Sequence, residues 1–305
     1  MPYMGGSMKV PLFSDREKLM KIMQVTGISR AKLARRLEVD YKTLWRWLDR
    51  EVKPQRRQSS DIDQIFKEYV DLREIITGLR KKARDPIEAL KKNKKIRDEF
   101  ILMMTYNSNA IEGSRMTIKD TEEAIAGNTV RGKKLFEILE AVNHKNAMEF
   151  MLREICPGFK ISEKYILKLH EIVMYNLNDK LPGAYRTGYV NLTNSDVVLP
   201  SAQEVPLKMS QLVRSINHYK RDPIGKIAKD HYDFEIIHPF FDGNGRVGRL
   251  LMTTQLLSQH FAPAVIRIED RYKYYMALEK CSHGDKNNII QMVCDGIMMG
   301  CNLIT

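Results

Sequence analysis

Hydrophobic residues recur at helical spacing along most of this chain. From about residue 96 onward one helix is expected to follow another, with a single β-rich interruption at residues 185–200. In that interruption, residues 185–192 favour a strand, residues 193–196 favour a turn, and residues 197–200 resume the apolar pattern. The pattern therefore predicts a mainly all-α fold with one small β-hairpin.

Two short helices joined by a tight turn are expected near the N-terminus. Ser29 can cap a helix that runs through Leu37, and Asp40 can cap a second helix over residues 41–50. Apolar residues fall where two closely crossing helices need buried side chains, namely at Leu33, Ala34, Leu37, Val39, Leu44 and Trp47. This spacing is similar to the helix-turn-helix of phage-repressor-like and transposase-like DNA-binding proteins.

One position departs from that helix-turn-helix pattern. Glu38 stands where the turn usually has glycine, so its backbone must adopt a left-handed or strained conformation. The resemblance places Lys42, Thr43 and Arg46 on the outward face of the second helix, where they could contact base edges. The alternative is a three-helix protein-docking module with a solvated basic face, and the sequence leaves both open.

Proline and composition divide the rest of the chain. Residues 54–60 are expected to form a linker before a helix over residues 61–84, and Asp85-Pro86 should interrupt that helix, because the residue before a proline disfavours helical geometry. We interpret residues 1–7 as an expression scar, 8–57 as the helix-turn-helix domain, 58–95 as a linker with a connecting helix, and 96–305 as the main helical domain.

Charge is concentrated at one end of the chain. The formal net charge is +12, and residues 8–57 hold 14 basic and 6 acidic side chains, which account for +8 of it. A small basic domain of this kind favours DNA as a partner, because phosphate contacts draw on Lys and Arg. The remaining residues are close to charge balance.

The densest chemistry lies in residues 238–249, His-Pro-Phe-Phe-Asp-Gly-Asn-Gly-Arg-Val-Gly-Arg. Gly243 and Gly245 flank Asn244 in a turn that can point backbone N–H groups into one concavity, and a helix of leucine-rich spacing follows. The N-terminus of that helix favours an anion. Arg246 and Arg249 stand in its first turn, where they repel each other and oppose the helix dipole, so a bound anion is expected.

This stretch matches HPFx(D/E)GNGRxxR, the signature of the Fic family, at every defined position. The resemblance implies a Fic-type helical core and transfer of AMP from ATP to a Ser, Thr or Tyr hydroxyl of a target protein. It assigns His238 as the base that takes the hydroxyl proton and Asp242 as a Mg²⁺ ligand. The hairpin is expected to be the flap that pairs with an extended stretch of the target.

The same resemblance implies a set of residues for the nucleotide. The backbone of Gly243–Gly245 and Asn244 would cradle the α-phosphate, whereas Arg246 and Arg249 would hold the β- and γ-phosphates. Relatives that phosphorylate their targets carry a lysine at the position of Gly245, so the glycine here favours AMP transfer.

A second motif lies upstream of the first. Residues 108–113, Ser-Asn-Ala-Ile-Glu-Gly, match the family's inhibitory pattern (S/T)xxxE(G/N). Ser108 and Glu112 are one helical turn apart and share a face, and Gly113 can end the helix as a C′ residue. The resemblance places Glu112 against Arg249, in the position of the γ-phosphate, so that the chain inhibits itself.

Two other functions are compatible with the same two motifs. A hydrolase that removes AMP would use Glu112 to position a water, and the sequence does not separate transfer from removal. A transcriptional regulator would use the helical domain as a nucleotide sensor, although the intact His238 and Asp242 argue against binding alone.

Composition bears on membrane association and on the redox compartment of the protein. Hydrophobic residues make up 43% of the chain, but no apolar run approaches the ~18 residues that a membrane span needs, so no membrane partner is expected. Cys156, Cys281, Cys294 and Cys301 lack zinc spacing and suit a reducing cytoplasm. Relatives of this subclass often form homodimers.

Overall fold

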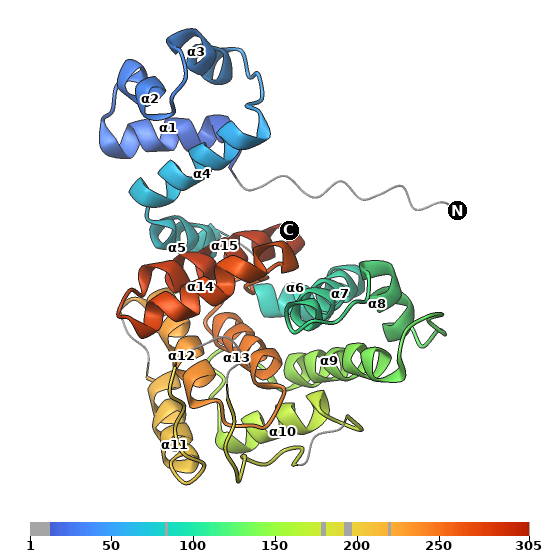
Figure 1. Ribbon diagram of the computed structural model, residues 1–305. Coiled ribbons are helices and arrows are strands. Elements are labelled where there is room, and N and C mark those ends of the chain that lie inside the picture. The colour runs from blue at the N-terminus through green and yellow to red at the C-terminus, as the bar shows by residue number, and fades with distance from the viewer. Residues whose placement is uncertain (1–12, 83–84, 178–180, 192–196, 219–220, 305) are drawn as a thin grey trace. The chain divides into compact units, whose positions relative to one another are not determined.

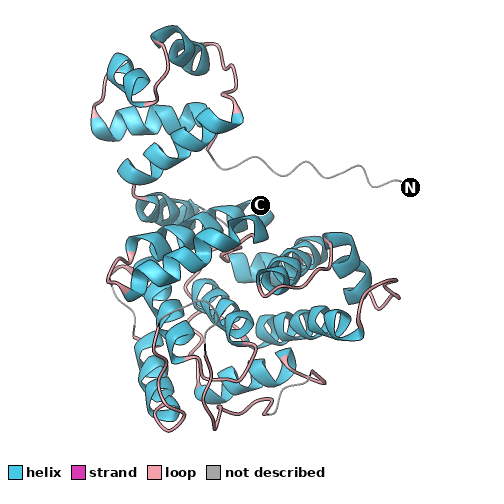
Figure 2. Cartoon of the chain, in the orientation of Figure 1, coloured by secondary structure: helices cyan, strands magenta, loops and turns pink. Residues whose placement is uncertain are grey.

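The computed structural model describes residues 13–82, 85–177, 181–191, 197–218 and 221–304. The chain divides into two compact units, Met1–Leu79 and Arg80–Thr305 (Figure 1). The described residues of both units form helices and loops and contain no strand (Figure 2). None of the helices described here is both long and apolar enough to traverse a bilayer.

The first unit is a small helical bundle. Its helices are α1 (Asp15–Thr26), α2 (Arg30–Arg36), α3 (Tyr41–Asp49) and α4 (Arg56–Tyr69), and α5 (Leu72–Lys82) crosses into the second unit. Helix α1 packs against α3 and α4, and α2 packs against α3. The bundle closes over fully buried aliphatic side chains contributed by every helix from α1 to α4, which include Leu19, Ile22, Leu33, Leu44 and Ile62.

The two short helices and the tight turn expected at residues 29–50 are present. The Ser29 side chain accepts from the N–H of Lys32, and the Asp40 side chain accepts from the N–H of Thr43. Glu38 adopts φ 52°, the left-handed conformation predicted for a residue that replaces the glycine of the turn. Five of the six apolar residues expected inside are buried, and the sixth, Val39, is half-buried.

The segment after this helix pair differs from the expectation. A linker at residues 54–60 and one helix over 61–84 were predicted, but α4 begins at Arg56, and Val70 leaves the helix with φ −110°. The Asp71 side chain accepts from the N–H of Arg73 and so starts α5. Because Ile62, Ile65 and Phe66 of α4 are buried and α4 packs on α1, the first unit continues well past residue 57. The predicted break at Asp85 is present, and Asp85 caps α6.

The second unit surrounds one buried helix. Its helices are α6 (Pro86–Lys92), α7 (Lys94–Ile111), α8 (Ile118–Ile125), α9 (Leu135–Glu154), α10 (Glu163–Val173), α11 (Val205–Ile216), α12 (Pro223–Ile237), α13 (Asn244–Ser258), the 3₁₀ turn η1 (Ile268–Asp270), α14 (Arg271–Ser282) and α15 (Asn287–Ile304). Nearly every residue of α13 is buried, and α7, α9, α10 and α12 pack around it (Figure 1). The first turn of α13 is thus the one place where its backbone N–H groups can meet a ligand.

The predicted β-hairpin is not seen. Residues 185–191 and 197–200 form no strand, and the expected turn at residues 193–196, with Leu192, lies outside the described residues. The carbonyls of Gly188 and Pro200, which a hairpin ladder would use, instead accept hydrogen bonds from the guanidinium of Arg186. The side chain of Arg186 therefore satisfies carbonyls for which local β propensity predicted a cross-strand partner.

Candidate active site

The turn between α12 and α13 contains two left-handed residues. His238 follows α12 with φ 47°, and Gly243 precedes α13 with φ 77°. The side-chain amide of Asn244 closes the turn, since it accepts from the N–H of Phe240 and donates to the carbonyl of Phe240, both at 2.9 Å. The amide of Asn244 thus shapes the turn, and the groups left for an anion are the first backbone N–H groups of α13.

The imidazole of His238 is oriented by the end of α12, where His238 is the C-cap residue. Its Nδ1 lies 3.3 Å from the carbonyl oxygen of Glu235. A carbonyl only accepts, so Nδ1 carries the ring proton and Nε2 holds the free lone pair. Burial lowers the pKa of His238, with the nearby Arg186 charge acting in the same direction. At neutral pH this side chain is a neutral base.

A second histidine, which the sequence did not single out, holds the turn between α12 and α13 through hydrogen bonds from α10. His170 on α10 accepts from the N–H of Gly183 through Nδ1 at 2.9 Å, so its Nε2 donates to the carbonyl of Asp242 at 3.1 Å. Its ring stacks on Phe240 with centroids 3.7 Å apart. A lone histidine on an amphipathic helix carries no local signal of such a role.

Glu112 and Arg249 meet near the start of α13, where Arg249 is the sixth residue and stands in the second turn, not in the first as predicted. Glu112 follows the last residue of α7, and Gly113 ends the helix with φ 104°. Arg249 donates from Nη2 to Glu112 Oε1 at 2.7 Å and to the Ser108 carbonyl at 2.8 Å, and from Nε to Ser108 Oγ at 2.9 Å. Burial by itself would lower the pKa of Arg249, but the Glu112 carboxylate reverses this and raises it. The structure thus brings together the residues of both motifs.

The position of the Glu112 carboxylate depends on Gly245. A Cβ atom added at Gly245 would lie 2.2 Å from Glu112 Oε1 and 3.0 Å from Arg249 Nη1. The carboxylate therefore lies directly over the first turn of α13, in the space that an anion at this helix N-terminus would use. Glycine at this position leaves room for the glutamate.

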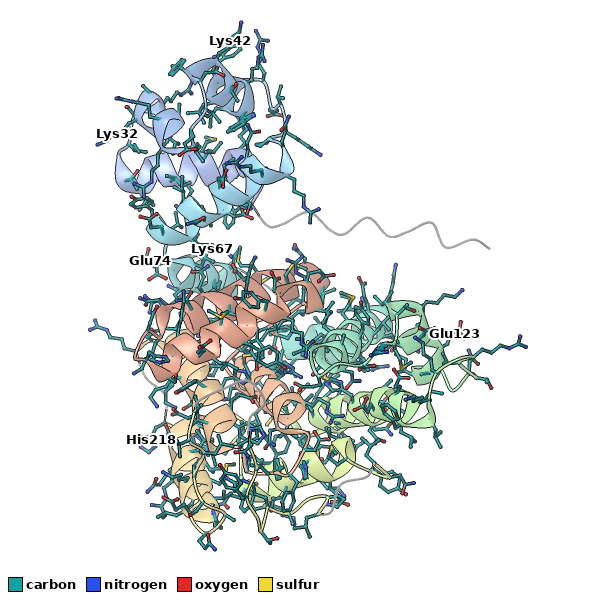
Figure 3. The ribbon with its side chains drawn as sticks, in the orientation of Figure 1. Lys32, Lys42, Lys67, Glu74, Glu123 and His218 are labelled. Carbon is teal, nitrogen blue, oxygen red and sulfur yellow. The ribbon has the colours of Figure 1, made fainter. Side chains whose placement is uncertain are left out.

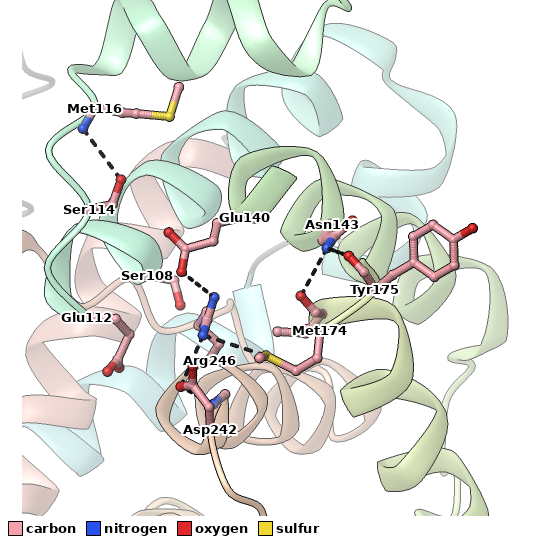
Figure 4. A network of polar contacts seen from close by, with 12 residues as sticks. Ser108, Glu112, Ser114, Met116, Glu140, Asn143, Met174, Tyr175, Asp242 and Arg246 are labelled. Atoms are coloured by element: carbon pink, nitrogen blue, oxygen red, sulfur yellow. Dashed lines mark hydrogen bonds and ion pairs between the residues drawn. The ribbon is translucent and has the colours of Figure 1, made fainter. Parts of the chain in front are cut away.

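Arg246 is held by a different carboxylate. It donates to Glu140 Oε1 of α9 at 2.8 Å and to Asp242 Oδ1 at 3.3 Å, and its Nη2 lies 3.6 Å from the sulfur of Met174 (Figure 4). Burial raises the pKa of Glu140, and the Arg246 charge opposes that rise. Glu140 carries no signal in the sequence, because nothing within α9 distinguishes it from a solvated glutamate.

The end of α10 is fixed beside this pair. Asn143 donates from its amide to the carbonyls of Val173 at 3.3 Å and Tyr175 at 2.6 Å (Figure 4). Met174 then lies under the turn, where a Cβ atom at Gly243 would meet its sulfur at 2.8 Å. Gly243 is thus required both by its left-handed φ and by this close approach.

The predicted DNA-contacting residues belong to the first unit. Lys42 and Arg46 are exposed on α3, and Lys42 and Lys32 of α2 point outward (Figure 3). The hydroxyl of Thr43 donates to Asp40 at 2.7 Å, so its side chain takes part in capping α3.

Comparison with known proteins agrees with this geometry. Residues 160–256 match the Fic/DOC family. The chain is 33% identical over 193 residues to the Protein adenylyltransferase Fic of Nematostella vectensis, a match that covers 62% of this chain and 45% of the relative. It is 31% identical over 211 residues to the protein of the same name from Drosophila erecta, which covers 68% of this chain and 42% of the relative. The chain thus spans less than half the length of these curated relatives.

Solved structures show the same fold. Fic-1 (residues 134–508) from C. elegans matches with a TM-score of 0.66 at 23% identity and covers 81% of this chain and 74% of its own. A Fic domain containing signaling protein from Bacteroides thetaiotaomicron matches with a TM-score of 0.63 at 23% identity and covers 77% of this chain and 96% of its own. With the turn, the buried α13 and the family match in agreement, the chain carries a domain of the Fic/DOC family.

Proposed function

We propose that this chain transfers AMP from ATP to a hydroxyl group of a target protein. The observation that carries the proposal is the placement of a neutral histidine base beside a helix N-terminus that carries two buried arginines. His238 offers Nε2 because its Nδ1 donates to the Glu235 carbonyl. The curated relatives are named protein adenylyltransferases, which supports this reaction over other uses of the site.

The chemistry follows from these groups. The target hydroxyl gives its proton to His238 Nε2, and its oxygen forms a bond to the α-phosphorus while the bond to the leaving pyrophosphate breaks. The backbone N–H groups at the start of α13 stabilise the charge on the α-phosphate. Arg246 and Arg249 would hold the β- and γ-phosphates, with Glu112 giving way to the nucleotide while Glu140 still orients Arg246.

Mg²⁺ fits one residue of the site. Asp242 is the side chain of the turn that faces solvent, with 68% of it exposed. Within the described ranges, no group of three or more His, Cys, Asp or Glu side chains could hold a metal. Mg²⁺ commonly binds through one or two carboxylates, with phosphate oxygens and water completing its shell, so a single aspartate suits it. Mg²⁺ on Asp242 would neutralise phosphate charge.

Labelled ATP tests the proposal. Purified protein incubated with α-³²P-ATP and a cell lysate should transfer label to protein, and His238→Ala should abolish transfer while ATP still binds. His218→Ala is the matched control, because His218 is exposed just after α11 (Figure 3). Undiminished labelling by His238→Ala would refute the mechanism.

We propose DNA binding as a second function, carried by the first unit. Support comes from the two capped helices, from the left-handed turn at Glu38 that lets them cross, and from the exposed Lys42 and Arg46 on α3. The excess of basic residues in 8–57 agrees with phosphate contacts.

A further inference from the structure

Arg186 is a buried arginine that the mechanism above does not use. Only 2% of its surface is exposed. Among the described residues, no carboxylate forms an ion pair with it, and burial lowers the pKa of Arg186. A buried cation without a counter-ion is unfavourable unless hydrogen bonds satisfy it. The acceptors of its five guanidinium N–H groups therefore show what keeps this charge buried.

The donors of Arg186 go to backbone carbonyls from three separate segments. Its Nε donates to the carbonyl of His238 at 2.8 Å, Nη1 to Gly188 at 3.0 Å, and Nη2 to Pro200 at 2.6 Å. Its own backbone N–H donates to the carbonyl of Pro239 at 2.8 Å. A planar guanidinium holds its donors in a fixed fork, so these carbonyls are held at fixed mutual positions.

One of these segments contains the base. His238 has φ 47°, a conformation that a residue with a side chain adopts at a cost unless its surroundings enforce it. Arg186 binds the consecutive carbonyls of His238 and Pro239, and so holds the backbone that aims the imidazole.

The other two carbonyls belong to Gly188 and Pro200, on either side of the predicted turn, and we call the described residues 188–191 and 197–200 the flap segment. Its described residues present exposed side chains, with Tyr189 77% and Val198 90% exposed. Arg186 binds the carbonyls at both flanks, Gly188 and Pro200. One side chain therefore joins the base to both parts of the flap segment.

We propose that Arg186 is a positioning residue that ties the backbone of His238 to the flap segment, so that Nε2 of His238 is held where proton transfer requires it. The proposal rests on the proposed AMP transfer. Lysine at this position keeps the charge but cannot reach three carbonyls in a fixed fork, whereas glutamine removes the charge.

The test compares Arg186→Lys and Arg186→Gln with the exposed control Arg214→Lys on α11. In Arg186→Lys, kcat for target labelling should fall at least about ten-fold with little change in KM for ATP, because misplacement at the reacting atoms affects the chemical step more than nucleotide binding. Arg214→Lys should behave as wild type. Unchanged kcat in Arg186→Lys, or an equal loss in the control, would overturn the proposal.

Two readouts do not depend on transferase activity and so separate this proposal from the proposed function. Chymotrypsin should cleave at Tyr189 several-fold faster in Arg186→Lys than in wild type, because both flanks of the flap segment lose their anchor. In Arg186→Gln, the NMR titration of the His238 ring should move to higher pH, since the neighbouring positive charge is gone, while Glu112 and Asp242 remain as the other charges that act on the ring. Unchanged cleavage together with an unchanged titration would reject the coupling, even in a protein that shows no labelling.

Discussion

The two units of this chain use arginine–carboxylate pairs of nearly the same length in opposite surroundings. In the second unit, Arg249–Glu112 is 2.7 Å long and Arg246–Glu140 is 2.8 Å long, and each arginine is 3% exposed. In the first unit, Arg36–Glu68 is 2.8 Å long with its side chains 41% and 51% exposed.

The difference teaches that burial, not distance, decides what such a pair does. Exposed pairs are screened by water and salt and are worth roughly 0–1 kcal/mol. In a buried pair, removing one partner leaves an uncompensated charge that must find another anion, which costs several kcal/mol. Arg249 is thus suited to exchange the Glu112 carboxylate for a phosphate, whereas exposed cations of the first unit such as Lys42 and Arg46 can contact a polyanion.

The largest expected effect concerns DNA binding by the exposed basic residues of the first unit. If about four phosphates are contacted, DNA affinity should fall on the order of a hundred-fold between 50 and 200 mM salt. The double variant Lys42→Ala/Arg46→Ala should weaken binding and lower the salt slope, and the control Lys208→Ala on α11 should not. Fluorescence anisotropy with genomic fragments measures this. No binding by wild type at low salt would make the first unit a protein-docking module.

The next largest effect concerns the buried pair over the turn. Glu112→Gly frees Arg249 and clears the space above Gly245, so self-modification and target labelling should rise ten-fold or more, since ~1.4 kcal/mol already gives ten-fold. Glu68→Ala, which breaks an exposed pair, is the matched control and should leave labelling unchanged. On a target already carrying AMP, loss of AMP removal by Glu112→Gly would assign Glu112 to hydrolysis.

Removal of the carboxylate should change labelling in opposite directions in the two buried pairs, with a rise for Glu112 and a fall for Glu140. Glu140 holds Arg246 from the side of α9 and, unlike Glu112, does not lie over Gly245. We therefore expect Glu140→Ala, made in the Glu112→Gly background, to lower labelling by several-fold up to about ten-fold through misplacement of Arg246. Glu140→Gln keeps an acceptor and should retain more activity. A rise with Glu140→Ala would make Glu140 a second inhibitor.

A smaller effect follows from the burial of the base. The lowered pKa of His238 keeps the imidazole neutral to lower pH than usual, so activity is full above that pKa and is lost as the pH falls through it. A histidine of ordinary pKa would be about half protonated at pH 6.5. Labelling by Glu112→Gly at pH 6.5 should thus exceed half of its plateau. An acid limb centred at or above pH 6.5 would contradict this reading of the site.

The smallest effect belongs to the exposed pair itself. Arg36→Ala should change the free energy of unfolding by less than about 1 kcal/mol, because Arg36 and Glu68 are both largely solvated. Chemical denaturation measures this quantity. A loss of several kcal/mol would show that the stacking of Arg36 on Tyr69, at 4.9 Å, stabilises the first unit far more than the ion pair does.

Local features of the chain were predictable from the sequence. The caps at Ser29 and Asp40, the left-handed turn at Glu38 and the end of α7 at Gly113 each depend on groups within a few residues of one another. The glycine-bracketed turn before α13 is of the same kind. Helix signals and a motif with defined positions report such short-range interactions directly.

Only the tertiary structure decided which distant residues contact one another. Arg246 and Glu140 are 106 residues apart in sequence, and no local sequence pattern indicates that they pair. The supports at His170 and Arg186, the packing of α4 on α1 and the replacement of the predicted hairpin all depend on which surfaces meet after folding. The sequence by itself determined the capped helix ends at Ser29 and Asp40, the turn before α13 and the residues that could do chemistry. Burial and long-range contacts, which depend on the packing of distant segments, decided which charges are paired and which remain exposed.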